Sequence, residues 1–107
     1  MGCMKTLQGK WLLSGPFRVA PTVELSTENG QVKGRTTIDI EGERTDFRVS
    51  HGVCNGVTVE LVFVNDIGEN DFGDKQFNYG GNCVGEDVFE GVCMGNISGA
   101  AKLKLIK

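Results

Sequence analysis

Regular alternation of apolar and polar residues is the feature of this sequence that most constrains its fold. It appears in eight short runs, at residues 7–14, 22–26, 32–40, 46–53, 57–64, 75–83, 87–94 and 100–106. A period of two places the apolar side chains on one face of a β-strand. No stretch of a dozen residues has the i, i+3, i+4, i+7 spacing of an amphipathic helix. The sequence therefore predicts an all-β protein.

The connections between these runs favour one architecture. Asn29-Gly30 and Asn55-Gly56 are strong hairpin signals, and most of the other connections are two to five residues long. Closing the first strand onto the last removes the exposed sheet edges. We expect an eight-stranded antiparallel up-and-down β-barrel. The alternative is a two-sheet β-sandwich, whose crossovers need longer connections.

Length and composition predict a single β-barrel domain over residues 1–107, with residues 1–6 as an N-terminal tail. The formal net charge is −3 and no block of Lys or Arg is present, which argues against a nucleic-acid partner. No apolar run is long enough to span a bilayer, and the N-terminus lacks the apolar segment of a secretory signal. The expected location is intracellular and cytoplasmic.

The four cysteines could form two disulfides in a secreted chain, but without a secretory signal we expect reduced thiols. None of them belongs to a C-x-x-C pair and His51 is the only histidine, so no metal site and no cofactor are predicted. The acidic segment 65–74 carries oxygen ligands of the kind calcium prefers. It lacks the calcium-loop spacing, so a solvated loop is the favoured interpretation.

The N-terminus carries the one targeting signal. Residues 1–6 match the myristoylation pattern M-G-x-x-x-[ST], with Gly2 as the acylated residue. Cys3 would supply the second acyl chain that firm anchoring needs. Lipidation at Gly2 and Cys3 is thus a membrane-anchored alternative to the cytoplasmic location, and it is the only route by which a membrane becomes a partner.

Several motifs resemble one family of barrels. Gly9-Lys10-Trp11 on the first strand is similar to the G-x-W opening of the calycins, which include lipocalins, fatty-acid-binding proteins and avidins. The rhythm of the later hairpins, with Phe77-x-Tyr79-x-Gly81, looks similar to that of small calycin-like barrels. The resemblance implies that Trp11 packs at the closed end of the barrel, beneath Lys102, Lys104 or Lys107. It also implies a ligand inside the barrel.

The alternation predicts which side chains face the interior. The bulky inward set is Trp11, Leu13, Leu25, Ile38, Phe47, Leu61, Phe63, Phe77 and Tyr79, with gaps at Gly9, Gly34, Gly81 and Ala101. Three polar residues are expected on the same face, at Thr36, His51 and Tyr79. One interpretation is a ligand pocket lined by Trp11, Thr36, Phe47, His51, Phe63 and Tyr79. The other is a packed core whose few polar groups are satisfied.

Three functional hypotheses follow. The first is non-enzymatic binding of a small apolar or amphipathic molecule inside the barrel. The second is a protein-interaction or structural module with a solid core, in which outward Val62, Val64 and Ile106 contact a protein partner or form a homodimer. The third is a calycin-type isomerase or lyase that uses His51 or Tyr79. A lone histidine without a recognisable nucleophile favours the non-enzymatic hypotheses, and no catalytic residue is assigned.

Overall fold

A computed structural model describes residues 6–40, 42–65 and 76–106. Several predictions lie outside these residues. They are lipidation at Gly2 and Cys3, the contact of Lys107 with Trp11, and the calcium alternative for segment 65–74, of which only Asn65 is described.

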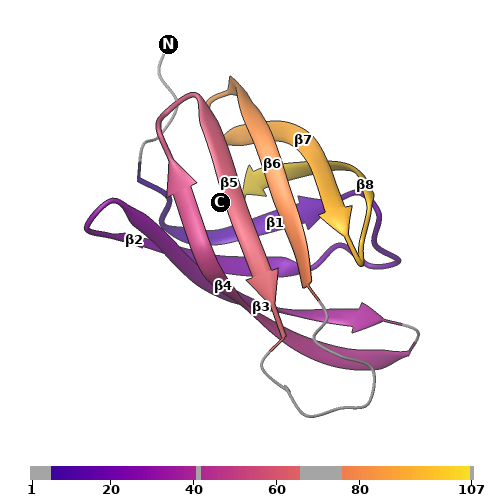
Figure 1. Cartoon of the computed structure of the whole chain (residues 1–107). Helices are drawn as coiled ribbons and strands as arrows, with labels where there is room; N and C mark the ends of the chain where they lie inside the picture. Colours follow the sequence, from indigo (N-terminus) through magenta and orange to yellow (C-terminus); the bar gives the residue numbers. More distant parts are fainter. Residues whose placement is uncertain (1–5, 41, 66–75, 107) are drawn as a thin grey trace.

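Eight antiparallel strands form a closed barrel in chain order (Figure 1). The strands are β1 (Gly9–Ser14), β2 (Thr22–Glu28), β3 (Gln31–Ile40), β4 (Glu43–Cys54), β5 (Thr58–Val64), β6 (Gln76–Gly85), β7 (Val88–Gly95) and β8 (Gly99–Leu105). The described residues contain no helix. The predicted up-and-down barrel is confirmed, and the alternative sandwich is wrong.

The ring closes between the first and last strands. Trp11 lies opposite Leu105 and Leu13 lies opposite Leu103, so β1 pairs with β8 as well as with β2. On the β2 side of β1, the backbone N–H of Leu7 donates to Thr27 Oγ1 at 2.9 Å, and the same hydroxyl donates to the Leu7 carbonyl at 3.0 Å. Leu7 is fully buried, so the segment before β1 covers part of the core.

The hairpin signals act as expected, with one difference in strand length. Asn29 and Gly30 both have positive φ angles, 52° and 80°, as a two-residue type I′ turn requires. The β4 strand begins at Glu43 rather than at residue 46, because residues 43–45 pair with residues 38–40 of β3. Residues 43–45, which lie before the predicted run 46–53, are therefore part of a longer hairpin.

The barrel interior is a single hydrophobic cluster, and all nine of the bulky residues predicted to face inward are buried in it. Phe77 is at the centre of its aromatic part. Its ring stacks on Phe63 at 4.7 Å between centroids and meets the edges of Phe47 at 5.3 Å and Phe17 at 6.2 Å. Aromatic pairs at such separations add to the stabilisation that burial provides.

Two of the glycine positions predicted to leave gaps are filled by their neighbours. A Cβ at Gly34 would lie 2.7 Å from Leu25 Cδ2, and one at Gly81 would lie 2.5 Å from the Tyr79 hydroxyl. These glycines therefore allow large side chains to fold over the strand, and they do not open a space in the core.

Packing decides the facing of β7. Phe89 and Cys93 are buried, whereas Val92 and Met94 are exposed on the outer wall. The outward apolar residues predicted elsewhere are placed unevenly, since Ile106 is exposed while Val62 and Val64 are only half-exposed.

The β3–β4 hairpin extends beyond the start of β2 (Figure 1). The β2–β3 ladder ends where Val23 lies opposite Thr36, while residues 37–40 of β3 continue to pair with β4. We call residues 37–40 and 43–46 the arm. The arm therefore continues past the last residue pair that joins β2 to β3.

The aromatic cluster gives a direct test of the core. We expect Phe77→Ala to lower the free energy of unfolding by about 3–5 kcal/mol, because three rings lose their common neighbour and a cavity remains. Val57→Ala, at a site that is 65% exposed, should change it by about 0.5 kcal/mol or less. Urea unfolding followed by Trp11 fluorescence measures both. A Phe77→Ala variant as stable as Val57→Ala would contradict this description of the core.

Candidate functional site

Five of the six residues predicted to line a ligand pocket are buried. Trp11, Phe63 and Tyr79 lie deep in the core. Thr36 and Phe47 are also buried, but they additionally line a hollow in the outer wall, next to the arm. The structure therefore separates the predicted set into core residues and residues that reach a groove.

His51 is the exception, and its predicted inward orientation is wrong. The register of β4 against β5 shifts between Val49 and His51, which is a β-bulge. Ser50 faces solvent as the alternation predicts, His51 faces solvent because of the shift, and Gly52 takes the next inward position. Bulges commonly re-aim side chains in this way. His51 lies on the outer face of the barrel and does not contact the core.

The two inward polar residues of the predicted set are hydrogen-bonded. Thr36 Oγ1 donates to the Thr22 carbonyl at 2.8 Å, at the point where the β2–β3 ladder ends. The Tyr79 hydroxyl donates to the Phe89 carbonyl at 3.2 Å. Burial is the main cause that raises the pKa of Tyr79 far above 10.0, so the phenol stays protonated. Both side chains behave as satisfied core groups.

The environment of Trp11 differs from the one the resemblance implied. Trp11 is fully buried, and its ring neighbour is Phe89 at 6.2 Å between centroids. Lys102 and Lys104 are exposed on the opposite face of the barrel wall, and Lys102 forms an ion pair with Glu90 at 3.2 Å. The predicted contact of Trp11 with either lysine is therefore wrong.

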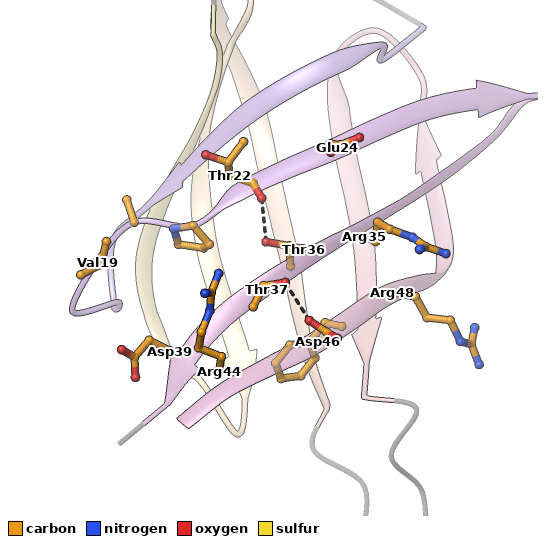
Figure 2. A pocket seen from close by; sticks show the side chains of 13 residues that line it. Val19, Thr22, Glu24, Arg35, Thr36, Thr37, Asp39, Arg44, Asp46 and Arg48 are labelled. Atoms are coloured by element: carbon orange, nitrogen blue, oxygen red, sulfur yellow. Dashed lines mark hydrogen bonds between the residues drawn. The ribbon is translucent and has the colours of Figure 1, made fainter. Parts of the chain in front are cut away.

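A groove of about 880 Å³ lies on the outer face of β2, β3 and β4 (Figure 2). One end is apolar and consists of Val19, Ala20 and Pro21, and Phe47 is a further apolar lining residue. The rest is polar and includes the charged residues Glu24, Arg35, Asp39, Arg44, Asp46 and Arg48. Because it combines an apolar end with a charged wall, we call it the amphipathic groove.

Cross-strand contacts order the polar wall of the amphipathic groove. Thr37 Oγ1 donates to Asp46 Oδ1 at 2.7 Å, which joins β3 to β4 (Figure 2). The Thr36 hydroxyl joins β3 to β2 through Thr22. These two bonds lie next to each other on the sheet, so the wall is held by both neighbouring strands.

A second groove, of about 690 Å³, continues along the same three strands toward the β2–β3 turn. Its cationic residues are Lys33, Arg35 and Arg48, and Glu24 is its one carboxylate. The imidazole of His51 and the hydroxyls of Ser26 and Ser50 also line it. We call it the basic groove. Glu24, Arg35 and Arg48 belong to both grooves, so the two adjoin.

The three shared residues form one row across the sheet. Glu24 lies opposite Arg35, and Arg35 lies opposite Arg48. In Figure 2 the Arg35 and Arg48 side chains extend in the same direction from neighbouring strands. Arg35 and Arg48 are like charges directly opposite each other, and Glu24 is a counter-charge within the same row. The row therefore places two guanidinium groups beside one carboxylate on the outer wall.

The cysteines only partly match the expectation of reduced thiols. Cys83 is disulfide-bonded, so that expectation is wrong for this residue, while Cys54 and Cys93 are thiols outside any disulfide. Burial raises the pKa of the Cys93 thiol to about 11, which leaves little of the reactive thiolate near neutral pH. In the described part of the chain, no three His, Cys, Asp or Glu side chains gather as a metal would require.

Sequence reasoning missed the arginine row, although the alternation did place Arg35 and Arg48 at outward positions. Their pairing depends on the β3–β4 register, in which Ile40 lies opposite Glu43. The predicted runs 32–40 and 46–53 left residues 43–45 in the turn and therefore did not give this register. The hollow itself left no signal in the sequence, because it depends on how far β3 and β4 extend past β2.

Comparisons of the chain with models of protein families, with curated proteins and with solved structures returned no match. Within residues 6–40, 42–65 and 76–106, no helix has the length and apolar character needed to cross a bilayer. The grooves and their residues are therefore the basis for any functional proposal.

The buried phenol and thiol set an alkaline limit to stability. Burial raises the pKa of Cys93 from 9.0 to about 11 and raises that of Tyr79 above 10.0. Above pH 9 the unfolded chain loses these protons before the folded chain does, so the free energy of unfolding falls as the pH rises from 9 to 11. We expect Cys93→Ala and Tyr79→Phe each to reduce this slope. Urea midpoints at pH 7, 9, 10 and 11 provide the measurement, and a double variant that keeps the full slope would refute the assignment.

Proposed function

We propose that this protein is a non-enzymatic binding protein that takes a small amphipathic molecule in the amphipathic groove. The observation that carries the proposal is the groove itself, which joins the apolar end at Val19, Ala20 and Pro21 to a charged wall. Its volume of about 880 Å³ is within the range of small-molecule sites. An apolar end next to a charged wall suits a ligand with one apolar and one polar part.

The proposal moves the ligand from the barrel interior to its outer wall. The inward positions Gly34 and Gly81 are occupied by Leu25 and Tyr79, and the Tyr79 hydroxyl is already hydrogen-bonded. These observations favour the packed-core interpretation of the inner face. Of the residues predicted from the sequence, Thr36 and Phe47 remain in the proposed site, at the inner wall of the groove.

The surroundings of Ser50 and Cys93 favour binding over catalysis by either residue. A serine nucleophile needs a base in hydrogen-bond contact, but the partner of Ser50 Oγ is the Val62 carbonyl, to which it donates at 3.4 Å. The Cys93 thiol is buried, and its raised pKa disfavours the thiolate. Neither residue has the environment of an activated nucleophile.

The groove can be tested with a matched pair of exposed valines. Val19 lines the amphipathic groove and is 70% exposed, whereas Val57 lies in the β4–β5 turn and is 65% exposed. We expect Val19→Asp to weaken binding of decyl maltoside about tenfold or more, because a carboxylate at the apolar end must be desolvated. Val57→Asp should leave the affinity unchanged.

Titration calorimetry and amide chemical shifts, below the micelle concentration, measure this effect. Saturable shifts at residues 19–22 and 36–47 are expected for the native chain. The absence of saturable shifts there, or an equal loss of affinity in both aspartate variants, would rule out the groove as the site.

A second candidate function, a protein-interaction module, is supported by the outer face of β7. Val92 and Met94 are 46% and 59% exposed there. Val62 of β5 is half-exposed and lies opposite Asn78 of β6, and Asn78 in turn lies opposite Met94 of β7. Exposed apolar residues that gather on one face mark contact surfaces.

If copies of the chain associate through this face, Met94→Glu should shift sedimentation from dimer to monomer. A native chain that sediments as a monomer at high micromolar concentration would exclude a homodimer.

A further inference from the structure

The β-bulge in β4 builds one side of the basic groove. Without it, strict alternation would point His51 into the core. With it, Ser50 and His51 both face outward, two and three residues along β4 from Arg48. The bulge therefore adds an imidazole to the outer face of the strand that already carries Ser50 and one of the two opposed arginines.

The charge of the basic groove contrasts with that of the whole chain. Three cations and one carboxylate line the groove, whereas the chain as a whole has more acidic than basic residues. Lys33 also forms an ion pair with Glu28 at 3.4 Å, but both side chains are largely exposed and such pairs contribute little. The groove is thus a local site of attraction for anions.

We infer that the basic groove binds a phosphoryl group, which is the polar head of the amphipathic ligand. Arginine forks match phosphate oxygens with paired hydrogen bonds. Ser26, Ser50 and His51 offer further polar contacts to a group with three free oxygens, which is one more than a carboxylate has. A phosphate monoester carries a charge of roughly −1.5 to −2 near pH 7, which complements the charge of the groove.

The two grooves suit one molecule because they adjoin. Glu24, Arg35 and Arg48 line both of them, so a head group held by the two arginines is next to the amphipathic groove. The apolar part of the ligand would then extend toward Val19 and Pro21. This step rests on the proposed function, whereas phosphoryl binding in the basic groove does not. The same groove could take a free phosphate, so the test has to separate the two sources.

Calorimetric titrations with inorganic phosphate, decyl phosphate, decanoate and decyl maltoside test the inference. We expect decyl phosphate to bind more tightly than decanoate and to perturb the amide shifts of residues 48–52 and 19–22 together. Arg35→Gln should weaken decyl phosphate about tenfold or more, since a charged hydrogen-bond partner is lost. His51→Gln should weaken it less. Arg35→Lys should bind with intermediate affinity, because it keeps the charge but not the fork.

Lys104→Gln is the matched control. Lys104 is exposed on β8 and lines neither groove, so its removal changes the net charge equally. Unchanged Trp11 fluorescence establishes that each variant is folded. Equal weakening by Arg35→Gln and Lys104→Gln would overturn the inference, since it would show a nonspecific charge effect.

The remaining outcomes separate the two proposals. If decyl maltoside and decyl phosphate bind equally well and Arg35→Gln weakens neither, the amphipathic groove stands and the phosphoryl site is refuted. If inorganic phosphate shifts residues 48–52 in an Arg35-dependent way while no decyl compound shifts residues 19–22, the phosphoryl site stands. The ligand is then a free phosphate, and the amphipathic groove is refuted.

Discussion

Pairing of β1 with β8 is the interaction on which the rest of this structure depends. It turns a row of hairpins into a ring, so that Trp11, Leu13 and Leu103 share one enclosed core instead of lying on an open sheet. Closure also removes the two exposed edges that a flat eight-stranded sheet would present. Once the ring is closed, alternation sends every second side chain inward, and the outer wall becomes the surface that remains for polar contacts.

The outer wall gains its features from departures from regular pairing. The arm exists because β3 and β4 extend past the start of β2, and its residues line part of the amphipathic groove. The bulge beside Val49 turns His51 outward into the basic groove. A regular barrel with the same inward residues would have neither feature. The core thus supplies stability, whereas the irregular positions shape the candidate site, as is common for bulges and strand ends.

Electrostatics on this wall follow from register rather than from composition. The chain has more acidic than basic residues, and its basic residues are scattered along the sequence. Hairpin pairing nevertheless brings Arg35 opposite Arg48, with Lys33 next on the same face of β3. The count of charges argued only against a nucleic-acid partner. Cross-strand neighbours, not sequence neighbours, determine the local field of a sheet.

The sequence by itself determined the all-β class, the antiparallel order and most of the core. Periodicity and turn chemistry are local properties, and Leu61, Phe63 and Phe77 therefore faced inward as predicted. Only the tertiary structure decided the orientation of His51, the facing of β7, the environment of Trp11 and the two grooves. Each of these depends on where one strand shifts or ends relative to its neighbour. That register is set by contacts between residues distant in the chain, and a two-residue period does not determine it.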